Sequence, residues 1–378
     1  MLSLKQTYLY VEFEVLDDKG NVVPRDKKIS TINCLGKTFV KSMKLLINGV
    51  ETEDTGSDYA YRAWLETELM FDAEAKRTSL APCFYYPSSG DKQESVDDAG
   101  YLKRSKLLAD GKTIQTMSPL HLNLFMQNRF LLNYIDLRLV IYRNSDVFCL
   151  KNYAHTATSP NYKLLIKDMK LYVKEIDVMD TITLAIERTL KCNNRVKYPL
   201  RNVQVRSFHV PKNALYAPDN MIFTDQLPRR VVVGLVSNKG YYGDVQSDPF
   251  NFKHYDVRHI SLETGGRTIP QNRYLLDYEN DRYVQPYVQF LEGLNFAGRR
   301  KGNGITMDQY KNGWCLYCFE ISLSTEEDSF EVLTSGTTSV RIEFAKPLPH
   351  DVTCIVYSEF QSLLHIDHMR NTVSDVNA

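Results

Sequence analysis

Alternation of apolar and polar residues recurs along this chain and favours a fold built from β-sheets. In Tyr8–Val15 every second residue is Leu, Val or Phe, and the residues between them are Tyr or Glu. Successive side chains of a strand point to opposite faces of a sheet, so this segment predicts a strand with one buried face. The same alternation returns in Phe39–Ile47, Ile135–Ile141 and Met169–Val173. The first half of the chain is therefore predicted to be a β-domain.

The second half carries the same kind of signal. Short runs rich in β-branched and aromatic residues are bounded there by Gly, Pro, Asn or Asp, as strands usually are. These runs are Arg230–Val236, Val257–Glu263, Tyr317–Leu323, Val340–Phe344 and Val352–Tyr357. The 24 Tyr and 17 Phe of the chain also suit half-buried sheet surfaces. We therefore predict an all-β protein.

Helical spacing is rare in this sequence. The clearest example places Tyr61, Leu65 and Leu69 on one face, behind Asp58 as a candidate N-cap. A shorter helix is predicted near Pro286–Leu291. We expect short helices of this kind in the connections between strands.

One order of elements occurs twice. Lys41–Ile47 is followed by an Asn48–Gly49 turn, a tyrosine-rich segment and a helix, and Val257–Glu263 is followed by a Gly265–Gly266 turn and the same two features. Two copies of a β-unit of about 150 residues fit two eight-stranded jelly rolls better than a solenoid or a propeller. We therefore predict two tandem jelly-roll β-sandwiches, at residues 1–180 and 211–378, with a linker at residues 181–210.

The motifs that could carry chemistry are incomplete. Gly36–Thr38 and Gly111–Thr113 lack the earlier Gly of a phosphate-binding loop. The two thiols of Cys315–Cys318 would diverge on a strand, and His365–His368 lacks the further ligands of a jelly-roll metal site. The basic run Arg299–Lys301 fits a solvated loop, with phosphate contact as the alternative. We expect no catalytic, cofactor-binding or metal-binding residues and no cofactor, and predict that the chain is not an enzyme.

Charge and cysteine usage narrow the partners and the location. Lys plus Arg and Asp plus Glu each total 46, so no net field attracts nucleic acid or an anionic membrane, and sequence-specific nucleic-acid binding is disfavoured. Charged residues interrupt both the N-terminal stretch and the most apolar run, Phe130–Tyr142, so neither a secretory signal nor a membrane-spanning segment is predicted. Seven scattered Cys and the absence of a glycosylation sequon predict a location in the nucleus or cytoplasm, without secretion.

Eight segments, taken in order, carry a family resemblance. They are Thr7–Glu14 (TYLYVEFE), Lys41–Gly49 (KSMKLLING), Tyr59–Thr67 (YAYRAWLET), Leu120–Phe125 (LHLNLF), Leu227–Arg230 (LPRR), Asp248–Phe252 (DPFNF), Tyr310–Leu323 and Ile355–Arg370 (IVYSEFQSLLHIDHMR). In order and spacing they resemble the major capsid proteins of Polinton/Maverick-type elements and adintoviruses. The resemblance extends over nearly the whole chain.

The resemblance implies a structural role. Members of that family have a double jelly roll, and three chains associate into a pseudo-hexameric capsomer that tiles an icosahedral shell. The implied partners are further copies of the chain in a homotrimer and in the capsomer lattice, together with penton and minor capsid proteins. The implied location is the virion, or capsid, inside the host cell, and no catalytic residues come with the family.

One departure from the family pattern concerns the first sandwich. Family members carry a segment before the strand at Thr7–Glu14 that supplies another strand, and here Thr7 stands six residues after Met1. We expect the first jelly roll to lack this leading strand, which would leave a sheet edge open to pairing.

Two other functions stay open. One is a tandem β-sandwich that binds or hydrolyses glycans, which predicts exposed aromatic residues around a groove with paired carboxylates. The other is a domesticated host protein that keeps the shell fold as a scaffold, and the sequence does not separate this from a capsid subunit.

Overall fold

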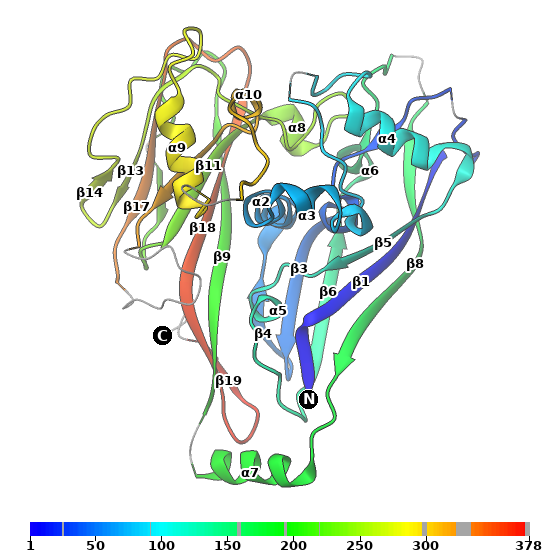
Figure 1. The fold of residues 1–378 in the computed structure, drawn as a ribbon, viewed down its shortest axis with the longest axis vertical. Helices are drawn as coiled ribbons and strands as arrows, with labels where there is room; N and C mark the ends of the chain where they lie inside the picture. Colours follow the sequence, from blue (N-terminus) through cyan, green and yellow to red (C-terminus); the bar gives the residue numbers. More distant parts are fainter. Residues whose placement is uncertain are drawn as a thin grey trace.

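Two β-sandwiches lie side by side in the computed structural model of the chain, with a helix at the lower end of the view connecting them (Figure 1). The structure describes residues 1–24, 26–90, 92–156, 160–192, 195–218, 220–296, 301–322 and 334–374. All strand pairs between named strands are antiparallel, as expected for jelly-roll sheets.

The first half runs from β1 to α7. Its strands are β1 (Leu2–Asp17), β2 (Ser30–Thr31), β3 (Val40–Ile47), β4 (Val50–Asp54), β5 (Ile114–Pro119), β6 (Leu137–Arg143), β7 (Leu150–Lys151) and β8 (Tyr162–Glu175). Its helices are α1 (Leu35–Thr38), α2 (Tyr59–Met70), α3 (Ala73–Arg77), α4 (Ala99–Leu108), α5 (Asn123–Met126), α6 (Asp146–Cys149) and α7 (Asp180–Lys191), with 3₁₀ turns at Gly56–Asp58, Ala81–Cys83 and Ala109–Gly111.

The second half runs from β9 to β19. Its strands are β9 (Val196–Val210), β10 (Asn220–Phe223), β11 (Arg230–Ser237), β12 (Phe252–Lys253), β13 (Val257–Thr264), β14 (Arg267–Ile269), β15 (Asn312–Gly313), β16 (Leu316–Glu320), β17 (Thr338–Phe344), β18 (Val352–Ile366) and β19 (Thr372–Ser374). Its helices are α8 (Asn238–Tyr242), α9 (Val284–Gly293) and α10 (Met307–Lys311). Leu323, the last residue of the strand predicted from Tyr317, lies outside the described residues.

Each half contains two main sheets, and their strand orders correspond. The order β5-β1-β8 in the first half matches β16-β11-β18 in the second, and β4-β3-β6 matches β14-β13-β17. The strand and helix predicted to repeat are β3 and α2 in the first half and β13 and α9 in the second. After the predicted turn, each strand is followed by a short strand that pairs with it, β4 or β14. The predicted internal repeat is therefore confirmed. Within the described residues the second half adds β9 and β19 beside β18 in one sheet and β10 beside β17 in the other.

The alternation of Tyr8–Val15 has the predicted structural basis. Leu9, Val11, Phe13 and Val15 are all buried in β1, and they belong to an apolar cluster that includes residues of both halves. The outer residue Tyr8 is exposed. Removal of one apolar face from water drives the sheet to pack in this way.

Residues 196–210 form a strand that sequence analysis missed. They were assigned to the linker, but β9 pairs with β18 along its whole length. The apolar residues of β9 change phase between Leu200 and Val203, so the strand shows no continuous alternation. Most of its residues are half-buried because β9 lies against β18 of the second half and also against α2 and α5 of the first half. The division of the chain at residues 181–210 stays a prediction.

The described helices are short. None of them has both the length and the apolar character that are needed to cross a membrane.

Candidate functional site between the two sandwiches

Helix α2 lies between the two sandwiches (Figure 1) and carries most of the candidate site. Every residue from Tyr59 to Leu69 is buried, so this helix has no solvent-facing side. Trp64 stacks on Phe250 of the second half at 5.2 Å between ring centroids and 5° between ring planes. Such contacts bury large aromatic surfaces and add a specific ring geometry. The helix therefore joins the two halves through its packing.

Asp58 occupies the predicted N-cap position of α2 but does not act as a cap. Its side chain makes no capping hydrogen bond to the helix. Instead, its carboxylate accepts hydrogen bonds from Tyr241 at 2.9 Å and from Ser207 at 3.2 Å, both in the second half. Burial raises the pKa of Asp58, although both hydroxyl donors oppose this effect. The predicted local role is wrong, and the residue serves as a link between the halves.

Arg62 is the centre of a buried polar network. Its side chain is 3% exposed and forms ion pairs with Glu53 of β4 at 2.9 Å and with Glu66 of α2 at 3.0 Å. It also donates a hydrogen bond to the amide oxygen of Asn123 at 2.9 Å. A guanidinium group presents several donors in one plane and can satisfy three acceptors at once. The two carboxylates therefore share one cation.

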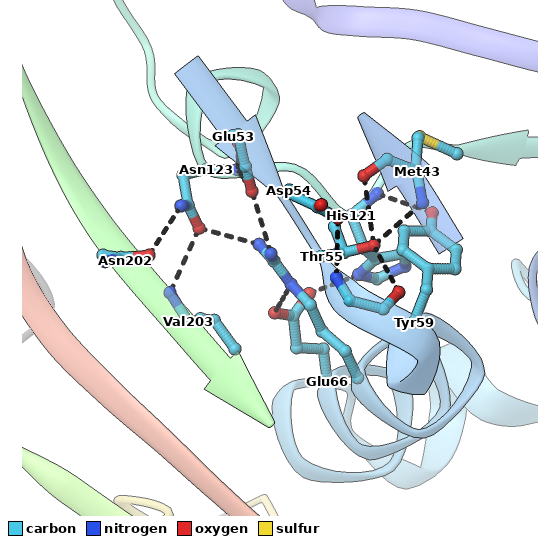
Figure 2. A network of polar contacts seen from close by, with 12 residues as sticks. Met43, Glu53, Asp54, Thr55, Tyr59, Glu66, His121, Asn123, Asn202 and Val203 are labelled. Atoms are coloured by element: carbon cyan, nitrogen blue, oxygen red, sulfur yellow. Dashed lines mark hydrogen bonds and ion pairs between the residues drawn. The ribbon is translucent and has the colours of Figure 1, made fainter. Parts of the chain in front are cut away.

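Asn123 carries this network into the second half (Figure 2). Its side-chain nitrogen donates to Asn202 at 3.0 Å, and its side-chain oxygen accepts from the backbone N–H of Val203 at 3.1 Å. Its own backbone N–H donates to both carboxylate oxygens of Glu53 at 2.9 Å. Because Asn202 and Val203 belong to β9, one amide side chain connects α5 to the sheet of the other sandwich.

His121 closes the network on the side of Glu66. Its Nδ1 contacts the Glu66 carboxylate, and its Nε2 is buried without a hydrogen-bond partner among the described residues. Burial, with the charges of Lys37 and Arg62, lowers the pKa of His121 to about 4, although Glu66 favours the protonated ring. Burial also opposes ionisation of Glu66, but Arg62 and His121 outweigh it and lower the pKa of Glu66 to about 2. At neutral pH the ring is neutral and Glu66 is ionised.

The free energy of unfolding is expected to fall as the pH drops from about 6.5 to about 4, the two pKa values of His121 without and with its folded environment. Within this range the unfolded chain binds a proton that the folded chain does not, so stability rises with pH. One such group contributes a slope of up to about 1.4 kcal/mol per pH unit. Urea unfolding at a series of pH values measures the slope.

A His121→Gln variant is the control for this slope. It is expected to reduce the slope above about pH 4.5, where His254 and His259, whose pKa values burial also lowers, still contribute in the same direction. The loss caused by Glu66 remains at lower pH, because a lowered carboxyl pKa gives stability that is lost on acidification. Burial raises the pKa of Glu53 and acts in the opposite direction, against the pull of Arg62. An unchanged slope in His121→Gln would show that the histidine does not control this range.

The arrangement is suited to structural linkage rather than to acid–base chemistry. A cavity of about 360 Å³ lies beside the network and is lined by both Glu66 and Glu359. Glu66 is paired with Arg62, and Glu359 with Arg230. A glycosidase needs one protonated and one ionised carboxyl group that are free to reach a sugar. These two carboxylates are instead held in ion pairs with arginines, which gives the glycan-hydrolase alternative no support.

One of the motifs considered in the sequence, Gly36–Thr38, lies close enough to this network for the charge of Lys37 to lower the pKa of His121. Cys315 and Cys318 are buried, and burial raises their pKa to about 11 and about 12, so neither is a thiolate at neutral pH. Lys37 of Gly36–Thr38 is buried and donates to Thr67 at 2.8 Å. Arg299 and Arg300 lie outside the described residues.

The histidine motif His365–His368 does not belong to a metal-binding group in the described part of the chain. His365 lies in β18, and His368 follows the strand. No group of three or more His, Cys, Asp or Glu within the described ranges could hold a metal ion. The expected absence of metals and cofactors stays a prediction.

Sequence analysis missed the contacts between the two halves that α2, Arg62 and Asn123 make, which we call the junction. The one available signal was the spacing of Arg62 and Glu66, four residues apart in a segment that is otherwise mostly apolar or aromatic. Charged residues at this spacing pair on one face of a helix, and an apolar surrounding indicates that such a pair is buried. No sequence pattern indicated that Asn123 and Asn202 would meet, because 79 residues separate them.

Comparison with known proteins gives one relative in sequence and several in structure. No family model matches the chain. The Caenorhabditis elegans "Uncharacterized protein F54H12.2" is 32% identical over 385 residues, and the match covers 99% of this chain and 90% of that protein. An identity of this size over almost the full length of both chains indicates common descent.

Solved structures of viral proteins share the fold. A chain of the Sputnik virophage, solved by cryo-EM, has a TM-score of 0.63 at 10% identity, covering 99% of this chain and 82% of that one. The mavirus major capsid protein has a TM-score of 0.54 at 9% identity, covering 98% and 83%. A chain of the PBCV-1 virus capsid has a TM-score of 0.54 at 11% identity, covering 97% and 89%. The predicted fold, a double jelly roll, is thereby confirmed.

Proposed function

The chain belongs to the family of the Caenorhabditis elegans protein F54H12.2, and we propose that it is a major capsid protein that forms an icosahedral shell. The observation that carries this proposal is the likeness to the mavirus major capsid protein, which includes both sandwiches and most of that protein's length. A shared fold alone does not assign a function. The proposal therefore also rests on the family resemblance of the sequence segments and on the character of the junction.

The duplicated architecture fits assembly into a lattice. Two similar sandwiches in one chain give six similar sandwiches in a trimer, so a threefold assembly can occupy a sixfold lattice position. Closed symmetry also limits open-ended growth. Such a subunit needs a fixed angle between its two halves. The Arg62 network and the stacking of Trp64 on Phe250 both join the halves at that point.

The purified protein is expected to have three times the chain mass of 43.7 kDa. Light scattering after size-exclusion chromatography measures this mass, and negative-stain electron microscopy should show particles with a pseudo-hexagonal outline. A protein that stays monomeric at all concentrations would contradict the capsid proposal.

The finer parts of the proposal concern origin and partners. We assign the gene to a Polinton/Maverick-type element or an adintovirus, with the protein in virions inside host cells and with penton and minor capsid proteins as partners. Residues 1–180 and 211–378 would be the two jelly-roll units. The DNA beside the gene tests the origin, since a packaging ATPase, a maturation protease, a protein-primed polymerase or an integrase is expected there. Their absence would favour a domesticated scaffold.

A further inference from the structure

The open edge of β8 distinguishes the first sandwich from the second. β8 is the last strand of β5-β1-β8, whereas its counterpart β18 is covered by β9 along its whole length. Val356 in the middle of β18 is 0% exposed, but Leu171 in β8 is 43% exposed. Within the described residues, no strand lies on the outer edge of β8.

This edge is apolar on the face that continues the core. Leu171 pairs with Leu9 and Met169 pairs with Val11, so their side chains share the face on which Leu9 and Val11 are buried. Met169 and Val173 are nevertheless exposed, as is Leu171. An edge strand with unpaired backbone groups and exposed apolar residues favours pairing with another strand.

We propose that β8 pairs antiparallel with β8 of a second copy of this chain, about a twofold axis at Leu171. A strand that pairs with itself in this way is an isologous contact, in which each residue meets its symmetry partner. The added strand would cover the edge as β9 covers β18 in the second half.

The pleat of β8 restricts the register of such a pair. One irregularity in its pairing with β1 places an extra residue at Lys167, between Ile166 and Asp168. The other places its extra residues on β1, between Ser3 and Tyr8. β8 therefore alternates without interruption through residues 168–174. Opposite residues must lie on the same face, so the axis must pass through a residue of this stretch.

Length and charge together select Leu171 as that residue. An axis there pairs all seven residues 168–174 with one another, whereas an axis at Met169 or Val173 pairs only three of them. With the axis there, Asp168 lies opposite Lys174 twice, and Met169 lies opposite Val173 twice. An axis at Lys170 would place that lysine opposite its own copy, and an axis at Tyr172 would place Lys170 opposite Lys174. Opposite charges across a strand pair stabilise it, and like charges destabilise it. The axis at Leu171 gives two charge-complementary pairs and no like-charge pair in the stretch 168–174.

A cysteine at the axis tests this geometry directly. Leu171→Cys is made in a Cys192→Ser background, because Cys192 is the exposed native cysteine and the other cysteines are buried. Residues directly opposite on antiparallel strands have Cβ atoms about 4.5–5.5 Å apart, which is close enough for a disulfide after a small adjustment. Mild oxidation is expected to link most of the protein into covalent dimers on a non-reducing gel.

Leu165→Cys is the matched control for the cross-link. Leu165 is as exposed as Leu171 and lies on the same strand, but an axis at Leu171 places it opposite Asp177, beyond the end of β8. It is expected to stay unlinked. Equal linking of both variants, or of neither, would overturn the proposal. A different strand bound at this edge would also leave Leu171→Cys unlinked.

Charge reversal provides an independent test in solution. Asp168→Lys and Lys174→Asp each place like charges opposite one another at two positions, and each is expected to weaken self-association about tenfold. Mixing the two variants restores both opposite-charge pairs, so the mixture is expected to associate like the wild type. Sedimentation velocity measures association, and circular dichroism checks that each variant is folded.

Lys163→Asp is the control, because Lys163 is exposed on β8 but lies outside the paired stretch. Its association is expected to match the wild type. A mixture that associates no better than its components would reject the pairing. The trimer of the proposed function is measured separately by mass, so a trimer without the Leu171 cross-link would reject only the β8 pairing.

Discussion

Replacing Arg62 by alanine is expected to lower the free energy of unfolding by about 3–5 kcal/mol. The guanidinium group is the cation shared by Glu53 and Glu66, and all three side chains are buried. Removal of Arg62 leaves two carboxylates near each other inside the protein, and the cost of a buried charge without a partner is large. Asn123, whose side chain also bonds to Asn202 and Val203 of β9, loses the hydrogen bond that it accepts from Arg62.

Urea unfolding of Arg62→Ala beside the wild type measures this loss. Lys44→Ala is the matched control, since Lys44 pairs with Glu51 and Asp54 at the surface. Exposed ion pairs contribute little because water screens them and because two long side chains lose freedom when they pair. The control is expected to unfold near the wild-type urea concentration. Equal losses of unfolding free energy in both variants would show that the buried ion pairs of Arg62 contribute no more to stability than the exposed ion pairs of Lys44.

Replacing Trp64 by alanine is the second substitution with a large expected effect, a loss of about 3–5 kcal/mol in the free energy of unfolding. The indole ring stacks on Phe250 and packs against Phe252 at 5.2 Å between ring centroids. Both phenylalanines belong to the second half, so truncation opens a cavity at the junction rather than within one sandwich. Loss of aromatic contact and incomplete collapse around the cavity both contribute.

Trp64→Phe is the control for the shape of this contact. It keeps an aromatic ring and most of the apolar surface, so its loss of unfolding free energy is expected to be clearly smaller than that of Trp64→Ala. Thermal and urea unfolding measure both variants, and light scattering measures whether each forms the proposed trimer. A loss of unfolding free energy below about 1 kcal/mol in Trp64→Ala would show that this contact contributes little more to stability than a surface residue does.

The class of fold and the internal repeat follow from local patterns in the sequence. Alternation such as that of Leu9, Val11 and Phe13 appears wherever one face of a strand is buried and the other faces solvent. The pattern depends only on the spacing of residues along the strand. The recurrence of strand, turn and helix in β3–β4–α2 and β13–β14–α9 was visible for the same reason. Local patterns of this kind can be recognised in the sequence without information on which distant residues are in contact.

Which elements contact one another follows from the tertiary structure and not from local patterns. β9 has neighbours in both halves, so it lacks the clear alternation that would mark it as a strand. Asp58 has the residue type of an N-cap, but its hydrogen-bond partners come from Ser207 and Tyr241 in the other half. β8 alternates like a buried strand, yet its apolar face is exposed because no neighbour covers that edge in the described part of the chain. Burial, pairing and charge balance at these positions depend on contacts between residues far apart in sequence, which no local pattern records.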